Sequence, residues 1–394
     1  MNGNDLQQKS PTSHIPALDG IRGLAIVMVV SFHSGLLVDG SNSGERLWLQ
    51  LVSAGWAGVD LFFVLSGFLI TTILLRNRDA PHYFRNFFMR RVLRIFPLYF
   101  GSLLLLFSLL TNLPHQSWYW LFAQNWIPVF EGGSQPMMVQ PFWSLAVEEQ
   151  FYLVWPFVIF LIKPRHVPAF CLIVAALTLA VRCVAWWRGV DAWIVMTVTP
   201  FRLDALACGG LVAAGRLAAV QPRPGKLLPI LFLTGLAGLV AIGILDGGYV
   251  INGRLTQTIG YSLFALMCAA LVAMVVDDHP VTRSPRRLLE WIPLRHLGNR
   301  SYAIYVIHMP VLILAKSFYV RRLQTQDVSG TADVQVCIAA VVICLLMAEI
   351  SWHLLEQPFL KLKKRFPSGQ ETVSGVTANA AGQPFRNESG CSGI

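Results

Sequence analysis

The stretch IRGLAIVMVVSFHSGLL, residues 21–37, decides how the rest of the chain is read. It is a candidate apolar helix with Arg22 near its start and His33 near its end. The two residues are just over three helical turns apart, so their side chains share one face, about 16 Å apart along the axis. In a membrane-spanning helix, His33 would lie inside the bilayer, where an unpaired ionisable group costs at least a few kcal/mol. We therefore expect a functional role for His33; the alternative is a hydrogen bond to a neighbouring helix.

The rest of the chain has the composition of a polytopic membrane protein. Hydrophobic residues make up 55% of it and charged residues 13%, whereas soluble proteins carry about 25% charged residues. Several mostly apolar stretches are each long enough to cross a hydrocarbon core of about 30 Å. They lie near residues 22–38, 56–75, 95–113, 144–162, 167–186, 202–220, 227–245, 257–276, 301–317 and 334–354. The sequence predicts an all-α polytopic membrane protein with about ten transmembrane helices.

The net charge of +10 predicts an orientation for these helices. Basic residues form short clusters between the apolar stretches, as the positive-inside rule describes, so we expect no nucleic-acid partner. The densest cluster, residues 76–97, contains six arginines and one aspartate. All clusters fall on the cytoplasmic side if Trp118–Phe130 is a short re-entrant or interfacial segment. We therefore predict a multi-pass protein of the cell inner (plasma) membrane with both termini in the cytoplasm.

The chain is expected to form one integral membrane domain, residues 15–366, after a polar segment, residues 1–14. Residues 367–394 are polar and rich in glycine and serine, and we expect a disordered cytoplasmic tail. We expect neither a signal peptide before the first span nor a soluble domain after the last one. Six of the seven cysteines lie in apolar stretches without metal-ligand spacing, so we infer neither disulfides nor a bound metal.

Acidic residues of other spans are expected at the depth of His33. Asp60 lies near the outer end of the second span, and consecutive spans are usually neighbours. An Asp60 carboxylate would orient the His33 imidazole and raise its basicity; alternatively, Asp60 pairs with an arginine or with backbone donors. In the fourth span, Glu148 and Glu149 point about 100° apart, so we expect only one of them, Glu148, to face the cavity of His33.

Two further groups of polar residues lie near the ends of later spans. Arg202 and Asp204 begin the sixth span, where we expect a structural ion pair. Tyr302, Tyr305 and His308 follow three-residue spacing from the inner end of the ninth span, with His308 about a turn and a half deep. This spacing predicts that they line a cavity reached from the cytoplasm; the alternative for the tyrosines is ordinary interfacial anchoring.

The arginines at the start of the third span suit phosphate binding. Arg91 and Arg94 lie one turn apart on one helix face, a geometry that can clamp phosphate groups. Any cytoplasmic loop supplies arginines for orientation, which is the simpler interpretation. Six arginines in one short loop are more than orientation requires, so we favour phosphate binding.

Seven motifs of the chain resemble those of the membrane acyltransferase-3 family, in the same order and spacing. The motifs are ALDGIRGLAIVMVVSFH, GVDLFFVLSGFLI, FFMRRVLRIFPLY, WSLAVEEQFYLVWP, FRLDALACGG, LGNRSYAIYVIHMP and LLEQPF. The resemblance covers roughly residues 14–362. It implies a ten-span fold that takes acetyl or a related acyl group from cytoplasmic acyl-CoA and O-acylates surface or exported carbohydrates; some relatives modify macrolides. Some relatives also carry a fused SGNH hydrolase-like domain, which we do not expect here.

The resemblance implies roles for individual residues. By the Arg-x10-His motif, His33 would be the catalytic histidine and Arg22 its support. By the RxxR motif, Arg91 and Arg94 would contact the phosphates of CoA. The cavity of Tyr302 and His308 would hold the donor on the cytoplasmic side.

These observations together predict an O-acyltransferase with acyl-CoA as donor, a carbohydrate or glycolipid acceptor, and membrane lipid around it. His33, oriented by Asp60 or Glu148, would deprotonate the acceptor hydroxyl; a transient acyl-histidine is the alternative route. A rival from another class is a secondary transporter or lipid-linked sugar flippase that uses His, Asp and Glu as a proton relay. Against it, no pair of Gly/Pro-interrupted spans occurs in matching halves of the chain.

Overall fold

The computed structural model describes residues 15–38, 40, 42–109, 114–133, 135–217, 226–247, 253–323 and 331–367, and these residues form helices without strands. The helices are α1 (Pro16–Ser34), α2 (Ser43–Val52), α3 (Gly58–Arg76), α4 (Tyr83–Leu109), α5 (Gln116–Trp120), α6 (Ile127–Phe130), α7 (Phe142–Leu161), α8 (Val167–Trp187), α9 (Ala192–Thr197), α10 (Leu203–Leu217), α11 (Leu227–Leu245), α12 (Tyr261–Val276), α13 (Arg283–Leu289), α14 (Ile292–Leu323), α15 (Thr331–Ser351) and α16 (Gln357–Lys361). Within this described part, nine helical segments are long and apolar enough to cross a membrane. The prediction of an all-α polytopic membrane protein is confirmed.

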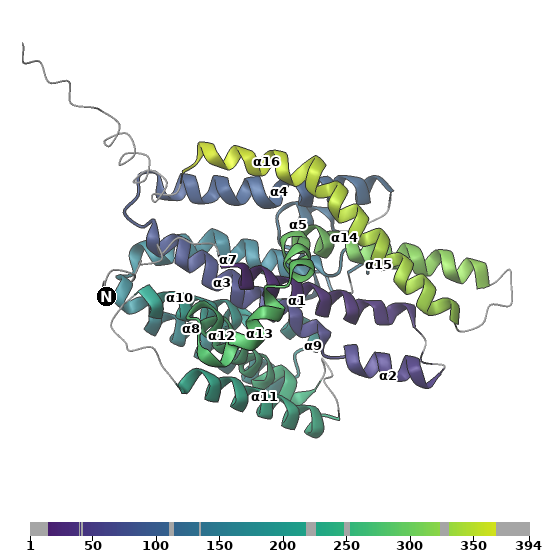
Figure 1. The fold of residues 1–394 in the computed structure, drawn as a ribbon, viewed down its shortest axis with the longest axis horizontal. Helices are drawn as coiled ribbons and strands as arrows, with labels where there is room; N and C mark the ends of the chain where they lie inside the picture. Colours follow the sequence, from purple (N-terminus) through teal and green to yellow (C-terminus); the bar gives the residue numbers. More distant parts are fainter. Residues whose placement is uncertain are drawn as a thin grey trace, which may run out of the picture.

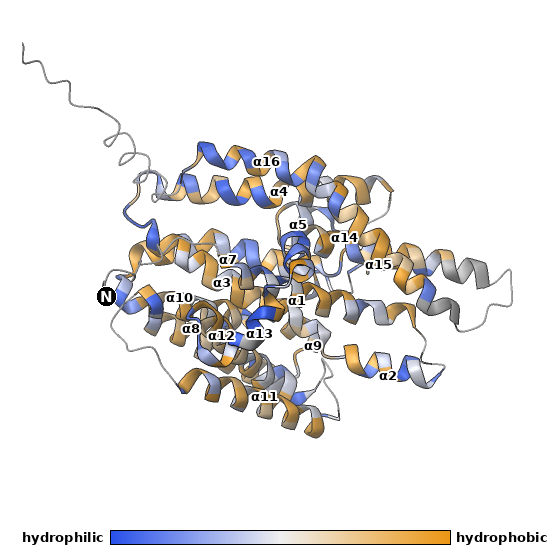
Figure 2. Cartoon of the chain, in the orientation of Figure 1, coloured by the Kyte–Doolittle hydropathy of each residue, from blue (hydrophilic) through white to orange (hydrophobic). Residues whose placement is uncertain are grey.

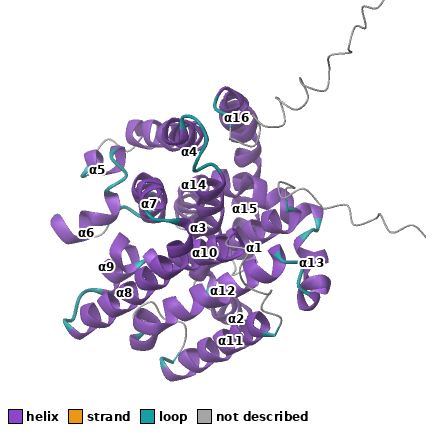
Figure 3. Ribbon diagram, turned by 90° about the vertical axis from the view of Figure 1, so that its left-hand side faces the viewer, coloured by secondary structure: helices purple, strands orange, loops and turns teal. Residues whose placement is uncertain are grey.

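The expected span near residues 202–220, the sixth in chain order, corresponds to α10, which is shorter than the helices of the other spans. Its 15 residues extend about 22 Å, less than a hydrocarbon core of about 30 Å, and residues 218–220 of the expected span lie outside the described part. Figures 1 and 3 nevertheless show α10 in the middle of the bundle, where it packs against α3 and α8. The helix is short but central.

Glycines allow α3 and α10 to approach closely. A Cβ atom at Gly67 of α3 would collide with the backbone carbonyl of Leu206 in α10. One at Gly209 of α10 would collide with the backbone carbonyl of Val64 in α3. Small residues at such crossings let helix backbones pack tightly where lipid offers no hydrophobic driving force. The α3–α10 pair therefore forms the rigid centre of the bundle.

The helices α1 and α14 pack by the same principle. A Cβ atom at Gly298 of α14 would collide with the carbonyl of Asp19 in α1, and one at Gly23 of α1 with the carbonyl of Leu294 in α14. These two helices are far apart in the sequence but adjacent in space. Their contact brings the C-terminal half of α14 beside the histidine-bearing end of α1.

Apolar side chains cover the outside of the long helices, as a bilayer requires. Figure 2 shows this colouring along α8 and α11. In α11 only Gly235 and Ile242 are buried, although the helix is almost wholly apolar. In water such a surface would be unfavourable, whereas in lipid it is the expected exterior.

The segment 116–130 does not form a span. It is divided into α5, a 3₁₀ turn at Gln124–Trp126 and α6. Phe122 has a positive φ of 52°, which turns the chain sharply after α5. The Trp120 ring stacks on Phe100 of α4 at a centroid distance of 5.6 Å. Within the described residues, no helix of this segment is among those long and apolar enough to cross a membrane, in agreement with the predicted re-entrant or interfacial segment.

The predicted orientation can be tested with single cysteines in a background cleared of the native thiols. Because residues 116–130 do not cross, cysteines at Gln116 and Glu131 should both react with a membrane-impermeant maleimide in intact cells. A cysteine at the exposed Arg165 should react only after permeabilisation, since its loop is one of the basic clusters. Labelling of Arg165 and protection of the other two would reverse the orientation. Labelling of only one of Gln116 and Glu131 would contradict the non-crossing segment.

Candidate active site

A cationic cavity of about 250 Å³ lies between α1, α3, α4, α7 and α14. Arg22 of α1 and Arg91 and Arg94 of α4 line it together. We call it the arginine cavity. The prediction that Arg91 and Arg94 share one face holds, and the structure adds Arg22, which is distant in the sequence. This concentration of positive charge favours an anionic ligand.

Polar atoms in the arginine cavity are buried without a hydrogen-bond partner among the described residues. They are Nε of Arg91 and Oε1 of Glu149. The Arg91 guanidinium lies over the Tyr152 ring at 5.5 Å, which positions it without using all its donors. Buried donors and acceptors normally find partners. A ligand in this cavity would supply them.

Both carboxylates of α7 lie in the arginine cavity. Glu148 and Glu149 line it, and the Tyr152 hydroxyl donates to Oε2 of Glu148 at 3.1 Å. Ser66 of α3 is hydrogen-bonded to the same Tyr152 hydroxyl. The prediction that Glu148 faces His33 while Glu149 points elsewhere is therefore wrong. Six residues past the start of α7, Glu148 is about 9 Å along the helix, and this depth puts it with the arginines.

A second cavity, of about 510 Å³, contains His33. We call it the histidine cavity. Its other walls are mostly apolar and aromatic, with Gln140 among the few polar groups. Val59 and Tyr305 line both cavities and so form the partition between them. The Tyr305 hydroxyl donates to the carbonyl of Pro141 at 2.8 Å and lies 2.5 Å from Oγ of Ser144.

His308 contacts His33. Its Nε2 lies 3.3 Å from Nδ1 of His33, and the ring centroids are 5.0 Å apart. We predicted His308 a turn and a half from the inner face, in the cytoplasmic cavity. That depth is wrong, because α14 begins at Ile292 and places His308 sixteen residues, about 24 Å, along the helix. His308 is 1% exposed and is outside the residues that line the arginine cavity.

Backbone carbonyls determine which nitrogens of these histidines carry protons. Nδ1 of His33 lies 2.9 Å from the Val29 carbonyl, and Nδ1 of His308 lies 2.7 Å from the Tyr305 carbonyl. A carbonyl oxygen only accepts, so in the neutral rings both Nδ1 atoms are protonated and both Nε2 atoms carry a lone pair. The single Nδ1–H of His33 is then shared between the Val29 carbonyl and, at the longer distance of 3.3 Å, Nε2 of His308. This assignment makes Nε2 of His33 the basic nitrogen.

Asp60 pairs with Arg202 instead of His33. The Arg202 guanidinium donates to Oδ1 of Asp60, and both side chains are buried. The Tyr261 ring packs on this guanidinium, 4.1 Å from the ring centroid. Of the two alternatives drawn from the sequence, the arginine partner is the one that the structure shows. The reason is that Asp60 faces α10 and α12, whereas His33 faces α14.

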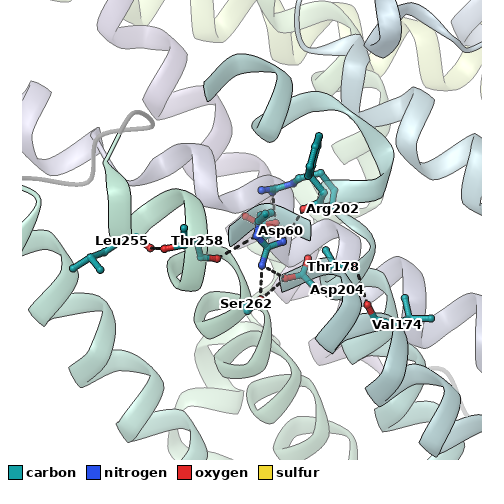
Figure 4. Close-up of polar contacts among 10 residues, drawn as sticks. Asp60, Val174, Thr178, Arg202, Asp204, Leu255, Thr258 and Ser262 are labelled. Carbon is teal, nitrogen blue, oxygen red and sulfur yellow. Dashed lines mark hydrogen bonds and ion pairs between the residues drawn. The ribbon is translucent and has the colours of Figure 1, made fainter. Parts of the chain in front are cut away.

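The expected ion pair between Arg202 and Asp204 is also wrong. Asp204 accepts from Arg182 of α8 at 2.7 Å and from the Ser262 hydroxyl at 2.7 Å (Figure 4). Residues two apart on a helix point away from each other, so each finds a partner on another helix. Two buried ion pairs thus join α3, α8 and the start of α10, and α12 contributes the Ser262 hydroxyl and the Tyr261 ring.

The remaining predicted residue, Tyr302, does line the arginine cavity. Its hydroxyl donates to the carbonyl of Ile95 at 2.8 Å. Arg182 and Lys363 were not among the predicted site residues. Arg182 is a charge inside an apolar span, which is itself a signal. Lys363 also lines the arginine cavity; its basic run, residues 361–365, is one of the clusters that the positive-inside rule explains by orientation alone.

Comparison with known proteins identifies relatives of this chain. YrhL of Bacillus subtilis (strain 168) is 29% identical over 377 residues, which cover 88% of this chain and 55% of YrhL. The O-acetyltransferase OatA of Staphylococcus aureus (strain NCTC 8325 / PS 47) is 29% identical over 381 residues, 90% of this chain and 59% of OatA. The peptidoglycan O-acetyltransferase OatA of Listeria monocytogenes is 27% identical over 375 residues, 88% of this chain and 56% of OatA.

The chain thus spans little more than half the length of the curated relatives it matches. No solved structure matches it. A family model described as an acyltransferase domain matches residues 15–349, which is most of the chain. The match begins just before α1 and ends within α15, so it includes both cavities apart from Lys363. The chain therefore belongs to the membrane acyltransferase-3 family.

Proposed function

We propose that this protein is an integral membrane O-acetyltransferase that moves an acetyl group from acyl-CoA to a hydroxyl of a surface or exported carbohydrate. The names of its relatives, O-acetyltransferases and peptidoglycan O-acetyltransferases among them, support the reaction and the class of acceptor. The observation that carries the proposal is the pair of cavities, one cationic and one with a basic imidazole, that share Val59 and Tyr305 as a wall.

The arginine cavity is the proposed donor site. Arg91 and Arg94 would hold the CoA phosphates, since guanidinium groups bind phosphate oxygens through charge-assisted hydrogen bonds. The geometry favours Arg22 as a third phosphate ligand, because it lies with these arginines and not with His33. Tyr302 would line the path of the acyl arm. The basic loops around this cavity favour its opening to the cytoplasm.

The histidine cavity is the proposed acceptor site. Nε2 of His33 would take the proton of the acceptor hydroxyl as its oxygen bonds to the thioester carbonyl carbon. The carbon–sulfur bond then breaks, and the CoA thiolate leaves with the proton returned by His33. His308 would serve as a positioning residue by accepting from Nδ1–H of His33. The acetyl group would reach His33 past the partition at Tyr305.

The reaction can be tested on purified protein without any ion gradient. Protein in phosphatidylcholine nanodiscs should release or transfer label from [acetyl-¹⁴C]acetyl-CoA. Nanodiscs have no second compartment, so a transporter that depends on a gradient would do nothing there. Mass spectrometry of surface glycans from wild-type and deletion strains should show O-acetyl groups only in the wild type. Equal O-acetyl content of the glycans from both strains, together with no turnover in nanodiscs, would contradict the proposal.

The donor site predicts a selective loss of affinity in the double variant Arg91→Gln/Arg94→Gln. Two charge-assisted hydrogen bonds are removed, so acetyl-CoA affinity should fall on the order of 100-fold. Added salt should weaken wild-type binding more than binding by this variant. The matched control is Arg165→Gln/Arg287→Gln, which removes the same charge from exposed positions. Equal affinities of the two double variants would assign Arg91 and Arg94 to orientation only.

A further inference from the structure

The C-terminal end of the described chain reaches into the arginine cavity. After α16, the 3₁₀ turn at Leu362–Arg365 consists of one leucine followed by three basic residues. Of these, Lys363 lines the cavity together with Arg22, Arg91 and Arg94. Its neighbours Lys364 and Arg365 are exposed. One ammonium group of this basic run is therefore directed at the donor site.

Contacts with α4 hold this turn in place. Arg90 donates to the carbonyl of Phe366 at 3.0 Å, and Asn86 donates to the carbonyl of Pro367 at 2.9 Å. The Arg85 guanidinium lies 5.6 Å from the centroid of the Phe366 ring. Figures 1 and 3 show α16 running beside α4, and the two helices are in contact. We call residues 362–367 the C-terminal strap; it is anchored on the helix that supplies Arg91 and Arg94.

We propose that Lys363 is a fourth cationic ligand for the phosphates of the donor, delivered to the arginine cavity by the C-terminal strap. The inference rests on the proposed donor site and extends it to a residue beyond the end of the family match at residue 349. The strap thereby couples the C-terminal end of the domain to donor binding.

Electrostatics supports this assignment. Four cationic side chains line one cavity. Two carboxylates, Glu148 and Glu149, line it as well. Like charges at short range in a poorly solvated site repel, and the two carboxylates offset only part of the positive charge, so bound anions would stabilise the arrangement. An ammonium group is a compact point charge with three donors and binds phosphate oxygens well. A diphosphate and a 3′-phosphate, as in CoA, would offer enough negative charge for all four groups.

The test compares Lys363→Gln with Lys364→Gln, which removes the same charge from the same turn at an exposed position. Both proteins, in phosphatidylcholine nanodiscs, are titrated with acetyl-CoA, acetyl-dephospho-CoA and S-acetylpantetheine. Lys363→Gln should weaken acetyl-CoA binding about tenfold, and Lys364→Gln should leave it within about twofold. S-Acetylpantetheine, which lacks the diphosphate, should bind both variants equally. Lys363→Arg keeps the charge and should restore most of the affinity.

Each outcome bears on the proposal. Equal affinities of Lys363→Gln and Lys364→Gln for acetyl-CoA would overturn it. If Lys363→Gln lost as much affinity for S-acetylpantetheine as for acetyl-CoA, the proposal would also be overturned, because Lys363 would then shape the cavity without binding phosphate. A lipid headgroup carries the same phosphate chemistry, so lipid co-purified from phosphatidylglycerol nanodiscs is measured as well; a loss confined to that lipid would contradict donor binding. If wild-type protein binds no acetyl-CoA at all, the proposed function fails instead.

Discussion

His33→Ala should lower acetyl transfer by about 10²–10⁴-fold, the usual contribution of a positioned general base. The substitution removes the imidazole that lines the histidine cavity and leaves the three arginines of the proposed donor site untouched. Acetyl-CoA affinity should therefore remain within a few-fold of the wild type. Turnover of labelled acetyl-CoA and equilibrium binding, measured on the same nanodisc preparation, separate the two effects.

The matched control for this variant is His166→Ala, which removes an exposed histidine from a loop. It should be as active as the wild type. Retention of more than a tenth of the activity by His33→Ala would exclude the general-base role. A fall in acetyl-CoA affinity comparable to the loss of turnover would place His33 at the donor site instead.

The sequence predicted the class of fold and the residue types of the site because these depend on local patterns. The length of the apolar stretches predicted the spans. The Arg-x10-His spacing on one helix placed Arg22 and His33 on one face at different depths. The structure keeps that relation: Arg22 lines one cavity and His33 the other. Local patterns also identified the segment at 116–130 as too short to cross.

The partners of the site residues were not predictable in the same way. Depth along a helix can be read from the sequence, but which neighbour a side chain faces depends on packing between distant segments. Asp60 was placed near His33 because the first two expected spans are consecutive, yet it faces Arg202, which directly precedes the distant α10. His308 was placed wrongly because α14 begins nine residues before the apolar stretch at 301–317, so the polar start of the helix concealed its true depth.

The ion pair of Asp60 and Arg202 gives the other large expected effect, on stability. Asp60→Leu or Arg202→Met alone should destabilise the protein by about 3–5 kcal/mol, because each leaves one charge buried without its partner. The double variant Asp60→Leu/Arg202→Met should recover most of this loss, since two apolar side chains of similar size replace the pair. Thermal unfolding in detergent, followed by size-exclusion chromatography, measures all three variants. Asp79→Leu, at an exposed loop position, is the control.

The same cycle separates a structural role of Asp60 from a catalytic one. If Asp60 only neutralises Arg202 and joins α3 to α10, the double variant should regain acetyl transfer together with its stability. If Asp60 orients His33, as the sequence alone suggested, the double variant should fold well and stay inactive. The buried contact with Arg202 and the packing of Arg202 on Tyr261 lead us to expect recovery of both. A stable but inactive double variant would return Asp60 to the catalytic machinery and require Asp60 to leave Arg202 and reach His33 during turnover.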